Sequence, residues 1–285
     1  MGQRRWTKVW AVGTMVLLVG GVAWAQVPGD SWSAGFYPAL GTARTLGLAG
    51  AFTAIADDAG GVLWNPAGIM QMRAKLGNAS AAVNVADADY LFLGFVQPAL
   101  EEGVCSGFAF INASTQAVRD DRVYQYTLAQ ELVERPLAFG ASLKYHTLST
   151  PGAEDEAVSF DLGVLYRYND VLRLGAAVLD VNEPSFRGIG RQWRMVNLGV
   201  ALAPDNSTLL AVDYYDVGDH ANQAALRFGG ERWITERLQL RAGITEGRFS
   251  VGFSIEYPTF RVDFAYQRVE EGADLNMLSV QAVFR

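Results

Sequence analysis

Residues 238–245 read Leu-Gln-Leu-Arg-Ala-Gly-Ile-Thr, and residues 260–267 read Phe-Arg-Val-Asp-Phe-Ala-Tyr-Gln. Successive strand residues point to opposite sides, so each stretch predicts a strand with one apolar and one polar face. About fourteen such segments follow one another from Leu76 to Arg285, and a tilted strand of roughly nine to eleven residues spans a bilayer. The pattern predicts an all-β membrane protein, a single antiparallel transmembrane β-barrel of about fourteen strands with lipid outside and a polar lumen inside.

The connections between these segments give a second indication of a barrel. Single-chain bacterial barrels keep both termini in the periplasm, with short turns there and longer loops outside. The connections at 169–171, 204–206 and 234–237 are short, whereas those at 115–122, 149–157, 182–192 and 269–274 are longer and polar. This alternation favours a barrel over a soluble periplasmic β-protein. The expected strands are 76–85, 90–97, 105–114, 123–132, 136–147, 158–168, 172–181, 193–203, 207–216, 223–233, 238–245, 249–257, 259–268 and 275–284.

The polar face of the predicted strands carries charges of both signs. An Arg or Lys facing mid-bilayer lipid costs about 2–4 kcal/mol, so this face must point into the lumen. Tyrosines and tryptophans near strand ends, Tyr90 and Trp233 among them, suit interfacial girdles. The candidate lumen-lining residues are Lys144, Asp161, Arg167, Arg173, Asp213, Arg227, Glu231, Arg241, Glu256, Arg261 and Asp263.

The start of the chain predicts export. Arg4, Arg5 and Lys8 form a positive region, residues 9–22 are apolar, and Ala23-Trp24-Ala25 offers small residues for cleavage, as in a secretory signal peptide. No later apolar run approaches the eighteen or so residues that a spanning helix needs. A mature chain in a membrane must therefore be a closed barrel, and we expect it in the outer membrane.

Residues 26–75 differ in kind from the strands that follow. Residues 46–56 are small, apolar and compatible with a helix, and a second short helical piece runs through Met72. Pro66 suits the first position of that piece, with Asn65 as its cap. A compact, glycine-rich unit needs a surface to pack on, so we expect a short N-terminal helical hatch inside the lumen. The expected division is 1–25 signal peptide, 26–75 hatch and 76–285 transmembrane β-barrel.

The hatch segment carries a recognisable motif. Gly-Ala-Phe at 50–52, the aspartate pair at 57–58 and Asn-Pro-Ala-Gly at 65–68 follow in order. The stretch 41–69 resembles the N-terminal signature of the FadL-like outer-membrane proteins. That superfamily includes long-chain fatty-acid and aromatic-hydrocarbon channels and the PorV/PorQ-like proteins linked to type IX secretion.

The resemblance implies a hatch folded inside the barrel and passive transport of small hydrophobic compounds across the outer membrane. The alternative is a PorV/PorQ-like structural or secretion-associated protein. The chain resembles those members in the shortness of its outer loops. Accordingly, the expected partners are outer-membrane lipid and either hydrophobic small molecules or secreted proteins. The residues that the resemblance assigns to the hatch or gate are Asn65, Pro66, Ala67, Gly68, Asp57 and Asp58.

Other functions have little support in the sequence. The net charge of −7 argues against nucleic acid as a partner. The single Cys105 excludes an internal disulfide, and no His/Cys cluster offers metal ligands, so no metal or cofactor is expected. His146 and His220 are far apart in the chain and are better explained as lumenal and solvated. We expect no enzyme; a membrane esterase is the alternative that replacing both histidines tests.

Overall fold

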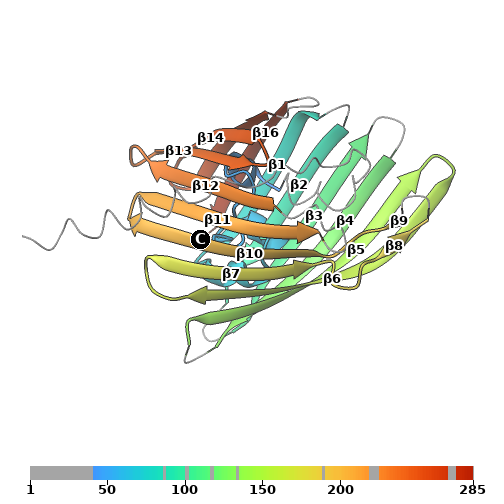
Figure 1. Ribbon diagram of the computed structural model, residues 1–285, viewed down its shortest axis with the longest axis horizontal. Coiled ribbons are helices and arrows are strands. Elements are labelled where there is room, and N and C mark those ends of the chain that lie inside the picture. The colour runs from blue at the N-terminus through green and yellow to red at the C-terminus, as the bar shows by residue number, and fades with distance from the viewer. Residues whose placement is uncertain are drawn as a thin grey trace, which may run out of the picture.

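The computed structural model describes residues 41–85, 88–99, 103–115, 119–132, 135–187, 190–217, 225–268 and 274–284. Within these ranges fourteen strands close into one antiparallel barrel, sealed by the pairing of β1 with β16 (Figure 1). This confirms the predicted fold class. The barrel strands are β1 (Lys75–Val85), β2 (Ala88–Gln97), β3 (Cys105–Thr115), β4 (Arg119–Glu131), β5 (Leu137–Thr150), β6 (Ala153–Arg167), β7 (Leu172–Leu179), β10 (Met195–Asp205), β11 (Thr208–Val217), β12 (Ala225–Trp233), β13 (Leu238–Thr245), β14 (Arg248–Glu256), β15 (Phe260–Arg268) and β16 (Leu275–Phe284).

Several expectations fall outside the described residues: the signal peptide at 1–25, the first part of the hatch at 26–40, and His220. We call the end at which β1 begins and β16 ends the periplasmic end, because single-chain bacterial barrels keep both termini there. The opposite end is called the extracellular end.

The predicted loop at 149–157 is wrong. Strands β5 and β6 continue through it and meet at a turn of Pro151 and Gly152. The acidic run at 154–156 suggested a loop, but charge does not prevent strand pairing where a hairpin is exposed to water on both faces. The connection at 180–194 also contains a small hairpin of its own, formed by β8 (Ser185–Phe186) and β9 (Gly190–Arg191). Two of the connections expected to be long extracellular loops therefore consist partly of strand.

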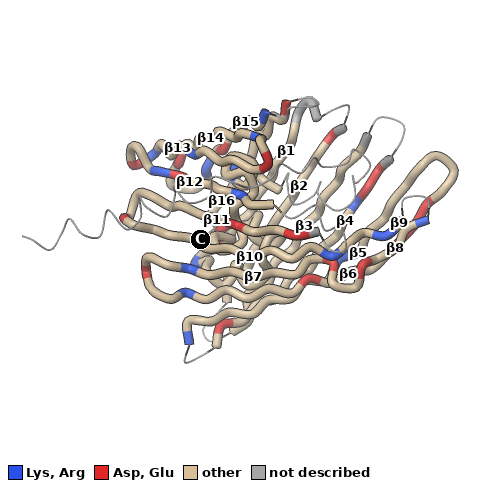
Figure 2. Tube along the Cα trace, viewed as in Figure 1, with Lys and Arg blue, Asp and Glu red and all other residues tan. Residues whose placement is uncertain are grey.

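The outside of the barrel is apolar. Leu143, Leu162, Leu198 and Leu278 are each about half exposed, and they alternate along their strands with buried residues. In Figure 2 long stretches of the strands carry no charge, and much of the charge lies toward strand ends and connections. Soluble monomers rarely expose a continuous apolar surface of this extent, so the outer face suits lipid.

The prediction that Tyr90 belongs to an interfacial girdle is wrong. Tyr90 faces the lumen, is 2% exposed, and donates a hydrogen bond from its hydroxyl to the carbonyl of Gly41 at 3.1 Å. It alternates with the outward residues Leu91 and Leu93, so its position in the pleat decides its direction more strongly than its residue type does.

Replacing Leu162 by arginine tests the assignment of the outer face to lipid. Leu162 is 53% exposed on this face, and a mid-bilayer arginine costs about 2–4 kcal/mol in barrels. We expect the free energy of unfolding in lipid vesicles, measured by urea titration, to fall by about that amount. Asn206→Arg in an exposed turn is the control and should change it by less than about 0.5 kcal/mol. Equal effects of the two substitutions would contradict the assignment.

The described part of the hatch contains three short helices. They are α3 (Ala43–Gly47), η1 (Ala59–Leu63) and η2 (Pro66–Gln71). Pro66 opens η2, and the Asn65 side chain caps it by accepting from the Ala67 N–H, as predicted. The predicted helix over 46–56 is wrong, because φ is positive at Ala49, Gly50 and Ala56 and each such residue breaks a right-handed helix.

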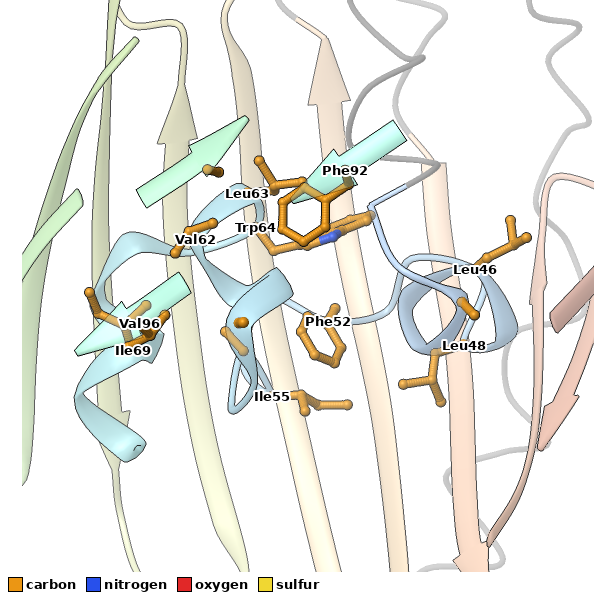
Figure 3. Close-up of a cluster of buried hydrophobic side chains, with 14 of the residues drawn as sticks. Leu46, Leu48, Phe52, Ile55, Val62, Leu63, Trp64, Ile69, Phe92 and Val96 are labelled. Atoms are coloured by element: carbon orange, nitrogen blue, oxygen red, sulfur yellow. The ribbon is translucent and has the colours of Figure 1, made fainter. Parts of the chain in front are cut away.

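The hatch lies inside the barrel and supplies much of its core. Phe52, Ile55 and Trp64 are fully buried, and they pack with wall residues such as Phe92 and Val96 (Figure 3). The ring of Phe52 meets that of Trp64 edge-on, with centroids 6.4 Å apart. No helix among the described residues is long and apolar enough to cross a membrane.

Candidate functional site

Glycines on the lumen wall receive the hatch. They occur as three directly opposed cross-strand pairs, and a Cβ atom on any of them would press against the hatch chain at 65–67, 53–54 or 48–51 respectively. The hatch backbone therefore lies directly on the wall. The sequence reading missed these residues, although their inward position in the strand alternation marks them. The pairs are Gly140 with Gly163, Gly175 with Gly199, and Gly229 with Gly243.

The Asn-Pro-Ala-Gly element joins the hatch to β6. The Asn65 Nδ2 atom donates to the carbonyl of Thr53 at 2.9 Å and to the carbonyl of Val164 in β6 at 3.0 Å. Pro66 and Ala67 lie directly inside Gly140. Asn65 is fully buried, so loss of these bonds would leave unsatisfied polar groups in the core. Of the predicted hatch residues, Asn65, Pro66 and Ala67 thus lie together on the wall at Gly140 and Gly163, whereas Gly68 lies against Ala56 of the hatch.

A charged network anchors the periplasmic side of the hatch. Arg44 in α3 pairs with Asp57 at 2.6 Å, with Asp58 at 3.0 Å and with Glu231 of β12 at 2.5 Å. Burial alone would raise the pKa of Asp57, but the guanidinium groups of Arg44 and Arg173 outweigh it and hold that pKa below its usual value. Both predicted aspartates thus contact the guanidinium of Arg44 within the hatch. Sequence reasoning did not single out Arg44, whose position next to the Gly-rich stretch gave no signal.

The structure brings some predicted lumen residues to the hatch. Arg173 and Arg261 reach Asp57 and Asp58 at 3.5 and 3.4 Å. The Oδ2 atom of Asp213 accepts from the N–H groups of Phe52 and Thr53 at 2.9 and 2.8 Å. Those whose side chains meet the hatch directly are Arg173, Asp213, Arg227, Glu231, Arg241 and Arg261.

Other predicted lumen residues pair along the wall. Lys144 contacts Asp161 at 2.7 Å and Asp180 at 2.5 Å, toward the extracellular end. Asp263 pairs with Arg241 at 3.0 Å. The remaining two lie near the periplasmic end: Arg167 pairs with Glu131, and Glu256 stands opposite Arg261.

His146 has no catalytic setting. Its Nε2 atom lies 2.9 Å from the hydroxyl of Ser159, which donates to Asp180 at 2.6 Å. A hydrolytic triad requires the acid on the far side of the imidazole, whereas Asp180 here contacts the serine. Ser159 is fully buried, so the arrangement is structural. No group of three or more His, Cys, Asp or Glu suited to a metal occurs among the described residues.

Two pockets lie near the hatch. An apolar groove of about 620 Å³ lies on the outer wall across β4–β7 and β10, lined by side chains such as Phe139, Leu162 and Leu198 and by the backbone of Gly140 and Gly163. A polar vestibule of about 490 Å³ lies beneath the hatch at the periplasmic end. Its lining includes Arg44, Arg173, Arg261, Asp57 and Glu231.

A closed antiparallel barrel with an apolar exterior, a charged lumen and a folded internal segment defines an outer-membrane β-barrel with a hatch. No family model and no curated protein matches the sequence. The CymD monoaromatic hydrocarbon channel is similar with a TM-score of 0.69 and 14% identity, over 88% of this chain and 99% of that chain. The P. putida toluene transporter TodX is similar with a TM-score of 0.63 and 13% identity, over 85% and 96%. These likenesses confirm the fold expected from the FadL-like resemblance. Nothing in them supports a PorV/PorQ-like protein.

Proposed function

We propose that the protein is a passive outer-membrane channel for small hydrophobic compounds, with residues 41–74 as its gate. The observation that carries the proposal is the filled lumen: a separately folded, largely apolar segment closes a barrel that would otherwise enclose a channel. No sheet pairing joins the described hatch to the wall. Its displacement would therefore leave the barrel's own hydrogen bonds intact.

The wall beside the hatch favours apolar permeants. Phe92, Val96, Ile111 and Val123 are buried on the lumen side of β2–β4 and form one cluster with the hatch core. A permeant that replaced hatch side chains on this surface would bury apolar area at about 25 cal/mol per Å². A polar solute would gain nothing there.

The two pockets differ in polarity, and this decides which of them a hydrophobic permeant favours. The vestibule carries arginines and aspartates, so a hydrophobic molecule gains little by entering it. The outer groove is apolar, and only the backbone of Gly140 and Gly163 separates it from Asn65 and Pro66 of the hatch. We infer that a permeant released by the hatch leaves through the wall at this groove.

Monoaromatic hydrocarbons are the permeants that we propose. CymD and TodX are described as channels for such compounds, and they share this fold. Toluene uptake by cells that carry the protein, against the same cells without it, tests the proposal. Equal uptake in the two strains would overturn it. A secretion-associated role has no observation in its favour here.

Deletion of residues 41–72 should open the barrel. The hatch fills the lumen, so we expect a large increase in single-channel conductance in planar bilayers and faster entry of small hydrophilic solutes. Electrophoretic mobility of unheated samples is the control for barrel closure. If the deletion variant forms a closed barrel but conducts no more than the full chain, the hatch is not the gate.

A further inference from the structure

Arg227 of β12 lies between two aromatic rings. The Cζ atom of its guanidinium is 3.8 Å from the ring centroid of Tyr215 in β11 and 5.2 Å from that of Trp64 in the hatch. A cation within about 6 Å of an aromatic face is attracted by the ring quadrupole, most strongly by tryptophan. The contact between the Trp64 ring and Arg227 therefore holds the hatch to β12.

Asp213 and Glu246 lie within electrostatic range of the Arg227 guanidinium, but neither forms a direct ion pair with it. In the described part of the chain Arg227 forms no ion pair within 4 Å, and its Nη1 atom is buried without a hydrogen-bond acceptor. The nearest cross-strand acid is Asp213, whose Oδ2 atom already accepts from Phe52 and Thr53 of the hatch. The faces of the Tyr215 and Trp64 rings are thus the groups that lie over this buried cation.

Gly50 of the hatch lies close against both the Trp64 ring and the Arg227 side chain. Gly50 has a φ of +78°, and a Cβ atom there would lie 2.7 Å from Cη2 of Trp64 and 3.2 Å from Nε of Arg227. The Nε1 atom of Trp64 is itself buried without an acceptor. Apart from its packing, the indole therefore owes its position to the cation.

A small apolar cluster adjoins this stack. Tyr215 belongs to a buried cluster with Leu179 and Met195, and Trp193 packs against that cluster. Trp64 directly precedes Asn65, which holds the carbonyl of Val164 in β6. A movement of Trp64 would consequently be transmitted to the element that seals the wall.

We propose that Arg227 is the residue that makes the channel selective for aromatic permeants, whose ring takes the place of Trp64 on the guanidinium. This rests on the proposed function. An aromatic ring can replace the indole face because it offers the same quadrupole, whereas an alicyclic ring of equal size cannot. The displaced Trp64 then draws Asn65 away from β6 and releases the gate.

The test compares toluene with methylcyclohexane, which has the same carbon skeleton and no π-face. Uptake is measured in cells with and without the protein, so that diffusion through lipid is subtracted. We expect the protein-dependent rate to favour toluene by about 2- to 30-fold, the range that a cation–π contact supports. In the Arg227→Met variant the ratio of the two protein-dependent rates should fall to about one. Arg227→Lys should keep part of the preference, and Arg232→Met, an exposed position on the same strand, should keep all of it.

The outcomes separate the two proposals. Equal protein-dependent uptake of both compounds by the unaltered chain overturns the selectivity of Arg227 but leaves the channel standing. If the protein increases the uptake of neither compound, the proposed channel function is overturned. A preference for toluene that survives in Arg227→Met also overturns the inference. Should that variant fail to fold, the comparison in the unaltered chain and in Arg227→Lys still decides.

Discussion

Replacing Gly140 by valine is expected to force the hatch off β5 and to raise the ionic conductance of the barrel by a large factor. A Cβ atom at Gly140 would meet the backbone of Pro66 and Ala67, closer than any real contact allows. Neither partner can turn a side chain aside, because the atoms on both sides belong to the main chain. The hatch must therefore move as a unit, and the valine methyl groups increase the displacement.

The size of this effect follows from the cost of overpacking. Extra methyl groups in a well-packed core cost about 1–3 kcal/mol, and a clash with backbone belongs at the upper end. A shift of about 3 kcal/mol changes the ratio of displaced to docked hatch by roughly 100-fold. Planar-bilayer recordings should show the change as a higher open probability.

Ala141→Val is the matched control for Gly140→Val. Ala141 is the next residue of β5, points outward into the apolar groove, and gains the same methyl groups without facing the hatch. We expect conductance at the level of the unaltered chain. A Gly140→Val barrel that is closed by electrophoretic mobility and conducts no more than Ala141→Val would show that the hatch does not rest on this glycine.

The barrel could be predicted from the sequence because its cause is local. Alternation in stretches such as 238–245 assigns one face to lipid and one to the lumen, and a slip by one residue would reverse both. The same alternation placed Asp213 and Arg227 on the lumen side. It also predicts the inward direction of Tyr90, where residue type alone suggested a girdle.

The hatch could be predicted only in part. The cap at Asn65 and the first helical position of Pro66 depend on neighbouring residues and are confirmed. The helix expected over 46–56 is absent because φ is positive at Ala49, which lies against Gly243 of the wall, and at Ala56, which lies against Gly61 and Gly68 of the hatch. Such long-range constraints leave no trace in local propensity.

The pairing of charged side chains within the lumen could not be predicted from the sequence either. Strand alternation shows that Arg241 and Glu231 face inward, but not which charge each meets, since register and the hatch decide this. The wall glycines were missed for a different reason. Glycines such as Gly163 and Gly175 weaken a strand when considered alone, and their use becomes visible only when neighbouring inward positions are compared.

Replacing Arg44 by methionine is expected to release the periplasmic side of the hatch. Arg44 links Asp57 and Asp58 of the hatch to Glu231 of the wall, and its side chain is 6% exposed. Removing one partner of a buried ion pair costs about 3–5 kcal/mol, because the remaining charges stay buried without compensation. We expect amide hydrogen exchange in residues 41–72 to accelerate by roughly 100-fold or more, while the barrel strands remain protected.

Arg122→Met is the control for Arg44→Met, since Arg122 also pairs with an aspartate but its side chain is 52% exposed. An exposed pair contributes about 0–1 kcal/mol, so hatch exchange should not change. Glu231→Leu in the Arg44→Met background should restore part of the protection, because it removes a carboxylate that the first change leaves buried. Additive effects of the two substitutions, or unchanged exchange in Arg44→Met, would mean that the glycine contacts and the apolar core hold the hatch without this network.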